Sequence, residues 1–382
     1  MAHKTRHRRP GSLAAITLVA LAAFSAVFSA ACESKDPIGP VEPRGAMGFV
    51  EPSPDAREIR LMSRNLYQGF STLAPLLQAT PQQLPVVAAG IFGEVVVTDF
   101  PARAEKLADE IAFTRPHLVG LQEVSRYRRQ VPADFMLNAS EDVYDFLEIL
   151  LDALEARGLD YEVAANVQNI DAEVPILWPG SPSGLADIRL TDRDVILVRG
   201  DVGWDQPQAL NYIAKLPVSV GGQPLLVPRG FTSVRATIGE RTLRFVNTHL
   251  EAFSPLVQVP QAQQLIGMLA GEALPTAVVG DLNSEADGST TPTYGMMTAA
   301  GFADVWPPRG QGETCCHSPD LGSMPSHFEE RIDFILLRGD FGFGPGGIAG
   351  STQSWLTGVR PSERTNSGLW PSDHAGIFTS VR

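Results

Sequence analysis

The stretch TAVVGDLNS at residues 276–284 sets the fold class of this chain. Residues 276–279 are apolar and branched, which is the pattern of a buried β-strand. Gly280, Asp281 and Asn283 follow at the point where that strand is expected to end. A strand that delivers polar side chains at its end favours a layered α/β or α+β domain with a site at one edge of a sheet.

Five other segments repeat this arrangement on either side of residues 276–284. The polar groups are Asn65 after an apolar run, Gln122-Glu123, Asn247-Thr248-His249, Arg331-Ile332-Asp333, and Ser372-Asp373-His374. One such cluster is commonplace in a turn or a helix cap. Six of them in one chain, built from Asn, Asp, Glu and His, indicate a shared site.

Segments with helical periodicity lie between the groups of predicted strands. Apolar residues at 104, 107, 108 and 111 predict a helix after Pro101. A second helix is expected from Ser140, its N-cap, to Gly158, and a third over residues 261–270. Residues 66–100 read as an irregular stretch punctuated by proline and glycine, in which short helices stay open. Strands outnumber helices, which favours one large domain over residues 58–382.

Composition limits the functions that are open to the chain. Hydrophobic residues make up 44% of its 382 residues and charged residues 19%, which suits a large core and excludes a disordered chain. The 43 acidic residues outnumber the 30 Lys and Arg residues, for a net charge of −13. A protein this acidic does not hold a polyanion by charge alone, so a phosphate-bearing substrate would need bound cations.

The amino terminus has the pattern of an export signal. Residues 1–10 are basic and polar, and residues 11–31 are apolar and uncharged. Cys32 follows at once, and the segment resembles a bacterial lipoprotein signal in which this cysteine becomes lipidated. Ordinary cleavage near residue 31 and an uncleaved anchor helix stay open. Residues 32–57 are rich in proline and are expected to form a tether. We therefore expect a cell-envelope lipoprotein held at the membrane, or otherwise a periplasmic or secreted protein.

Two further cysteines, Cys315 and Cys316, are adjacent in the sequence. Adjacent cysteines make a poor disulfide framework. A metal site with His317 lacks a second Cys/His pair to complete it. A local structural role or free thiols is the interpretation that the sequence favours.

The chemistry of the strand-end residues favours a hard cation. Carboxylate and amide oxygens are the ligands preferred by Mg²⁺, Mn²⁺ or Ca²⁺ rather than by zinc. Two histidines beside carboxylates supply acid and base groups for a phosphoryl oxygen.

In their order and spacing, the six clusters resemble the endonuclease/exonuclease/phosphatase superfamily of metal-dependent phosphoesterases. The resemblance covers residues 58–382 and implies a four-layer αββα sandwich, with two packed sheets flanked by helices and the site at one end of the sheets. It implies metal-binding roles for Glu123, Asn65 and Asp373. It implies catalytic roles for five residues: His249, Asp281, Asn283, Asp333 and His374. Asp194 is a further catalytic candidate, evenly balanced against a role in solvating a strand end.

These features predict an exported, divalent-metal-dependent phosphoester hydrolase, with a nuclease-like phosphodiesterase as the leading hypothesis. A sphingomyelin or phospholipid phosphodiesterase and an inositol-phosphate phosphatase are the alternatives. An inactive binding or scaffold protein on the same fold is a hypothesis of another class. Four arginines are candidates for a substrate wall, with a solvated charged face as the default interpretation: Arg103, Arg126, Arg128 and Arg129.

Overall fold

A computed structural model describes residues 58–306, 312–341 and 352–382. The expected signal segment 1–31, Cys32 and the tether 32–57 lie outside the described residues. The other expectations fall on described parts of the chain and are compared with the structure below.

The strands of the described residues form two large sheets and a separate hairpin. Sheet A holds β1 (Ile59–Asn65), β2 (Leu118–Gln122), β3 (Arg126–Gln130), β4 (Glu141–Asp145), β5 (Tyr161–Leu177), β6 (Leu185–Arg199), β15 (Thr352–Thr357) and β16 (Gly376–Val381). Sheet B holds β7 (Gly203–Asn211), β10 (Gly230–Ile238), β11 (Arg241–His249), β12 (Thr276–Asp281), β13 (Ala303–Asp304) and β14 (Asp333–Arg338). The separate hairpin is β8 (Leu216–Val220) with β9 (Gln223–Val227).

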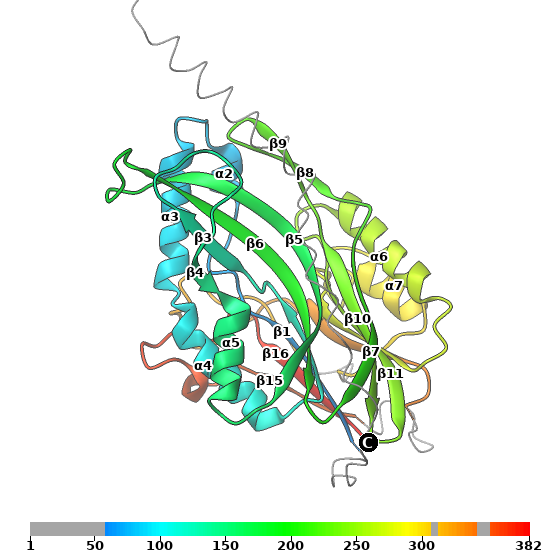
Figure 1. The fold of residues 1–382 in the computed structure, drawn as a ribbon. Helices are drawn as coiled ribbons and strands as arrows, with labels where there is room; N and C mark the ends of the chain where they lie inside the picture. Colours follow the sequence, from blue (N-terminus) through cyan, green and yellow to red (C-terminus); the bar gives the residue numbers. More distant parts are fainter. Residues whose placement is uncertain (1–57, 307–311, 342–351) are drawn as a thin grey trace, which may run out of the picture.

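Helices cover the outer faces of the two sheets (Figure 1). They are α2 (Ala74–Gln78), α3 (Leu84–Val97), α4 (Phe100–Thr114), α5 (Phe146–Glu155), α6 (Pro255–Leu269) and α7 (Thr293–Ala299), with a short 3-10 helix at Pro361–Glu363. Three apolar cores separate the layers. One packs α3, α4 and α5 on sheet A, one fills the space between the sheets, and one packs α6 and α7 on sheet B. The predicted four-layer sandwich is therefore confirmed.

Strand register brings the polar strand ends to one edge of the sandwich. In sheet A, β1 and β2 run parallel with Asn65 opposite Gln122. In sheet B, β11 and β12 run parallel and β12 pairs antiparallel with β14. Parallel neighbours end at the same edge of a sheet, so residues from distant parts of the sequence meet there.

The strands and helices that carry the motifs match the sequence expectation closely. The helix predicted after Pro101 is α4, whose buried face includes Ala104, Leu107 and Ile111. The helix expected from Ser140 begins later, at Phe146, with Asp145 as its N-cap. Residues 141–145 instead form β4, because they pair with β3. The N-cap prediction for Ser140 was therefore wrong.

Residues 66–100, expected to be irregular, contain α2 and α3. Proline lies in the first turn of both helices. Sheet A also holds a long hairpin of β5 and β6, of which the sequence predicted only residues 194–199 as a strand. These elements enlarge the domain at the end opposite the chain's carboxyl terminus in Figure 1.

Arg103 is fully buried, so the expectation that it belongs to a solvated face or a substrate wall was wrong. Its guanidinium donates to four backbone carbonyl oxygens, those of Thr98, Leu66, Pro371 and Tyr67, over 2.7–3.1 Å. Arg103 therefore ties the segment that follows β1 to the segment that precedes β16.

The other arginines of that group are paired with acidic residues. Arg126 pairs with Asp142, and Arg129 pairs with Glu141. Both pairs are partly exposed, which fits the default interpretation of a charged face. Arg128 is more buried and pairs with Asp171.

Within the three described ranges, no single helix is long and apolar enough to cross a membrane. The bent pair of α3 and α4 passes that test jointly, by length and composition alone.

Replacement of Arg103 by Met should lower the free energy of unfolding by about 3 kcal/mol or more, because buried carbonyl groups lose their donors. Arg126→Met is the matched control, and its loss should stay under about 1 kcal/mol because its ion pair is exposed. Urea denaturation of both variants measures the difference. Equal losses in the two variants would show that the Arg103 contacts contribute little.

Candidate active site

Three predicted site residues lie in one row across the end of sheet B. His249 is opposite Asp281 in the parallel pair β11 and β12, and Asp281 is opposite Asp333 in the antiparallel pair β12 and β14. All three are almost completely buried. The register therefore places an imidazole and two carboxylates side by side without any help from loops.

Sheet A brings Asn65 and Glu123 to the same place. Asn65 Nδ2 donates to Glu123 Oε1 at 3.2 Å and to Asp281 Oδ2 at 3.3 Å, which joins the two sheets. Glu123 Oε2 accepts from the backbone N–H of Gln68 at 2.7 Å. Asn65 and Glu123 thus form the sheet A side of the site.

The backbone at position 280, directly before Asp281, requires a glycine. Its φ is +142°, and a Cβ built there would lie 1.9 Å from the carbonyl oxygen of Thr248. No other residue fits this close approach of β12 to β11. Asn283 follows with a positive φ of 48°, and its N–H donates to Asp281 Oδ1 at 2.9 Å. Its side-chain amide donates to the carbonyl oxygen of Leu250 at 3.0 Å.

His374 is held by Asp333. Its Nδ1 lies 2.8 Å from Asp333 Oδ2, and its Nε2 lies 3.9 Å from Asp281 Oδ2 and 4.0 Å from Asp373 Oδ1. Burial lowers the pKa of His374, but the carboxylates of Asp333 and Asp373 outweigh burial and raise this pKa well above its usual value. His374 is therefore an imidazolium at neutral pH, with its Nε2–H directed toward Asp281.

His249 is in the opposite state. Arg229 Nη1 lies 3.1 Å from His249 Nδ1, and a guanidinium only donates, so Nδ1 must be the unprotonated acceptor. Burial and then the charge of Arg229 lower the pKa of His249 well below its usual value. The neutral ring carries its proton on Nε2, which lies 3.6 Å from Asp281 Oδ2.

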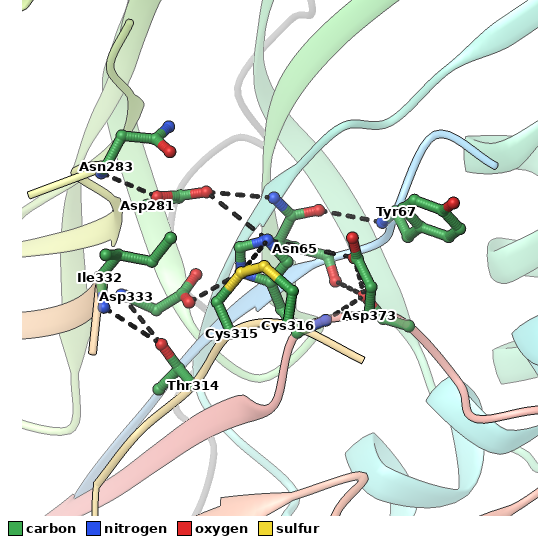
Figure 2. The surroundings of a disulfide bond; sticks show 12 residues. Asn65, Tyr67, Asp281, Asn283, Thr314, Cys315, Cys316, Ile332, Asp333 and Asp373 are labelled. Carbon is green, nitrogen blue, oxygen red and sulfur yellow. Dashed lines mark hydrogen bonds and ion pairs between the residues drawn. A yellow bond between two sulfur atoms is a disulfide. The ribbon is translucent and has the colours of Figure 1, made fainter. Parts of the chain in front are cut away.

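The carboxylates of the site lack neutralising charge. Burial and the neighbouring Asp333 raise the pKa of Asp281 to about 8. Burial raises the pKa of Asp373 to about 6. The charge of His374 opposes this rise, and the charge of Glu123 adds to it. Figure 2 shows Asn65, Asp281, Asp333 and Asp373 converging on one space. Carboxylate oxygens gathered without enough positive charge are a donor set that fits a hard divalent cation.

Three site residues were missed by the sequence analysis: Arg229, Asp192 and Asn169. Arg229 Nη1 lies 3.6 Å from Asp192 Oδ2. Asn169 Nδ2 donates to Asp192 Oδ2 at 3.1 Å and to Asp194 Oδ2 at 2.9 Å. Asp194, the weaker candidate, is fully buried behind Asn169, and burial together with Asp192 raises its pKa well above the usual value.

The positions of Asp192 and Arg229 in the sequence could have identified them as site residues. Asp192 lies two residues before Asp194 and alternates with it along the same strand, and Arg229 stands directly before the strand that pairs with His249. Asn169 lies inside β5 and carries no local pattern that distinguishes it from other polar strand residues.

Cys315 and Cys316 are joined by a disulfide, so the interpretation of free thiols was wrong, and a local structural role is the alternative that agrees with the structure. Figure 2 shows this disulfide at the site, and Cys315 Sγ lies 3.6 Å from His374 Nε2. His317, with which the sequence disfavoured a metal site, stacks on Trp370 with ring centroids 4.5 Å apart. The sequence missed this arrangement because Cys315 reaches His374 through backbone pairing across 59 residues.

The model of the endonuclease/exonuclease/phosphatase family matches residues 92–374. This chain belongs to that family. Members of the family are phosphoester hydrolases that depend on divalent metal ions. No curated protein matches the chain at a significant level.

Several solved structures are similar to this chain at low sequence identity. An endonuclease/exonuclease/phosphatase family protein from Leptotrichia buccalis is 12% identical with a TM-score of 0.50, over 85% of this chain and 99% of that chain. A protein of the same description from Bacteroides vulgatus is 16% identical with a TM-score of 0.50, over 85% and 98% of the two chains. D. rerio TDP2 complexed with single strand DNA product is 14% identical with a TM-score of 0.46, over 85% and 99%.

Asp333→Asn should lower the pKa of His374, because it removes the carboxylate that stabilises the imidazolium. Phosphoester hydrolysis should fall by roughly 10²- to 10⁴-fold, the usual contribution of a positioned acid or base. NMR titration of the histidine rings in EDTA measures the pKa. Asp304→Asn, which removes a carboxylate that pairs with Arg331 at 2.8 Å, is the matched control. An unchanged His374 pKa in Asp333→Asn would contradict the assigned pair.

Proposed function

We propose that this protein is an exported, divalent-metal-dependent phosphodiesterase. One observation carries the proposal. The Nε2 atoms of His249 and His374 approach the same oxygen, Asp281 Oδ2, at 3.6 and 3.9 Å. Two N–H donors and one carboxylate around a common point suit a phosphoryl group and the water that attacks it.

The protonation states divide the work between these residues. The pKa of Asp281 is raised to about 8, so its ionised form is a stronger base than an ordinary carboxylate and is suited to accept the proton of the attacking water. The His374 imidazolium, oriented by Asp333, donates to a phosphoryl or leaving oxygen. The neutral His249 donates a second hydrogen bond from Nε2, because Arg229 occupies its Nδ1.

Glu123 and Asp373 are the residues that would hold the metal, and Asn65, whose Nδ2 donates to Glu123 Oε1, would orient that carboxylate. A divalent cation there supplies positive charge against the charge that builds on the phosphoryl oxygens. Mg²⁺ is the ion we propose first, because the donors are oxygen atoms and Mg²⁺ also accepts substrate phosphate. Mn²⁺ and Ca²⁺ suit the same oxygen donors.

Arg229 adds a fixed positive charge to the site. Its Nε is buried and has no hydrogen-bond partner in the part of the chain that the structure describes. An unpaired buried donor costs stability unless a ligand satisfies it. We propose that Arg229 binds a phosphate oxygen.

A diester of modest charge suits this site better than a long nucleic acid or an inositol polyphosphate. Among the described residues that line the cleft beside the site, Arg229 is the basic one. Arg126, Arg128 and Arg129 are paired with acidic residues and give no free basic stripe. With a net charge of −13, the protein repels a polyanion.

Export and membrane attachment are part of the proposal on the strength of residues 1–57 alone. The basic start, the apolar run and Cys32 support a lipoprotein signal, and the proline-rich residues after it support a tether. An enzyme held in this way would meet its substrate at the cell envelope.

The protein lacking residues 1–31 retains every described element and should hydrolyse p-nitrophenyl methyl phosphate with Mg²⁺ but not with EDTA. His374→Ala should reduce this rate by at least about 100-fold. Release of p-nitrophenol measures the activity. Mg²⁺ should also raise the melting temperature, and Glu123→Gln should remove that rise. If neither turnover nor a Mg²⁺-dependent shift appears, the chain is a binding or scaffold protein on this fold.

Arg229→Met should lower kcat/KM for the same ester by roughly 10- to 100-fold, since a charged hydrogen bond to phosphate contributes about 1.5–3 kcal/mol. The pKa of His249 should rise, because the neighbouring positive charge is gone. Arg235→Met is the control, because Arg235 pairs with Asp205 on an exposed part of sheet B. Steady-state kinetics across a pH series report both changes. A loss of equal size in Arg235→Met would argue against a role for Arg229 in phosphate binding.

A further inference from the structure

An apolar cavity of about 80 Å³ lies among α2, α3, the β5–β6 hairpin and the β8–β9 hairpin. Figure 1 shows these elements gathered at one end of the molecule. The lining includes Leu76 of α2, Ala88 and Phe92 of α3, and Val218 and Leu225 of the β8–β9 hairpin. All lining side chains are apolar except that of Tyr127, whose hydroxyl already donates to the carbonyl oxygen of Gln68 at 2.7 Å.

This cavity adjoins the cleft beside the active site. The cleft has a volume of about 310 Å³ and shares six lining residues with the cavity: Leu73, Leu77, Ile170, Leu190, Val218 and Val227. The far wall of the cleft is polar and holds Arg229, Asp192 and Asn169. Arg229 in turn contacts His249. A ligand with its head at Arg229 would therefore have the apolar cavity next to it, across the side chains that line both spaces.

The two ends of this space differ in the chemistry that they accept. A cavity lined by Leu, Ile, Val and Phe offers water no hydrogen bonds and takes up hydrocarbon instead. A volume of about 80 Å³ accommodates roughly three groups the size of a water molecule or a methylene, at about 30 Å³ each. The other end offers a guanidinium and an imidazole N–H, which suit an anionic head.

We propose that the natural substrate is a phosphoester that carries an aliphatic chain, with the phosphate at Arg229 and His249 and the chain in the cavity. The proposal rests on the phosphodiesterase function and names its substrate class. Because α2, α3 and the β8–β9 hairpin form the cavity walls, it also assigns a role to residues 66–100.

One exposed large apolar side chain lines the cleft. It is Phe253, which is 65% exposed. Exposed large apolar side chains beside a cleft are typical of sites that take ligands from an apolar environment. A chain that enters past Phe253 stays in contact with apolar groups on its way to the cavity.

Binding of octyl phosphate and ethyl phosphate, measured by isothermal titration calorimetry, tests the proposal without catalysis. Both carry the same head, and octyl phosphate has six more methylenes. Each buried methylene is worth about a fourfold gain in affinity, so octyl phosphate should bind at least about 100-fold more tightly even if part of the chain stays outside. Equal affinities would overturn the proposal.

Two neighbouring residues of β9 provide a matched pair of variants. Leu225 lines the cavity, whereas Leu226 points the other way and is 57% exposed. Leu225→Trp should abolish the preference for octyl phosphate and leave ethyl phosphate binding unchanged, and Leu226→Trp should change neither. Ala88→Phe on α3, with the exposed Val86→Phe as its control, repeats the test if Leu225→Trp does not fold. An octyl preference that persists in both folded cavity variants would overturn the proposal.

Hydrolysis separates this proposal from the proposed function. The monomeric esters p-nitrophenyl octyl phosphate and p-nitrophenyl methyl phosphate are compared with Mg²⁺ present. If neither is hydrolysed but the octyl preference in binding holds, the chain site stands and the phosphodiesterase function fails. If both are hydrolysed at equal kcat/KM and bind equally, the function stands and the chain site fails.

A vesicle assay identifies the source of the chain. Phosphatidylglycerol vesicles present the same chemistry within a bilayer. Hydrolysis of vesicle lipid that Leu225→Trp reduces supports a membrane lipid as substrate. Hydrolysis confined to the monomeric octyl ester supports a soluble amphiphile.

Discussion

The side chain of Asn247 connects the two sheets, and the active site depends on that connection. Its Oδ1 accepts from Gln122 Nε2 at 2.6 Å, and its Nδ2 donates to the carbonyl oxygens of Leu121 and Val195 at 2.9 and 3.0 Å. These are polar groups buried between the sheets, where an unpaired partner would be costly. Gly120 permits the close approach, since a Cβ there would lie 2.4 Å from Val279 Cγ2. The strand ends of both sheets are thereby held in a fixed relation.

That fixed relation accounts for the unequal states of the two histidines. Both rings are buried, and both approach Asp281, but one has a carboxylate behind it and the other a guanidinium. A buried imidazole takes the protonation state that its nearest charge favours. The position of Asp333 therefore favours the protonated form of His374, and the position of Arg229 favours the neutral form of His249.

The sequence predicted the parts of this site that coincide with strand ends. His249, Asp281 and Asp333 follow from apolar runs interrupted by polar residues, and the order of the motifs indicated the fold. Arg229 was missed although it stands directly before the strand that pairs with β11, and Asn169 was not predicted because its importance comes from cross-strand neighbours rather than from a local pattern. Ser140 was misassigned for the same reason, since pairing with β3 draws the residues after it into a strand. The helices within residues 66–100 have short, strongly apolar sequences. No local sequence pattern predicts that they pack over the β5–β6 hairpin.

Arg103 and β1 link regions that are far apart in the chain, and this has a consequence for synthesis. β1 pairs with β16 along its length, and Ser380 contacts Glu58 across 322 residues. A nascent chain on the ribosome lacks β16, Asp373 and His374 until nearly all of the sequence has been translated. Contacts of such long range also form slowly. The candidate site is therefore completed in a late folding step, and a fragment that ends before residue 373 lacks Asp373, His374 and β16.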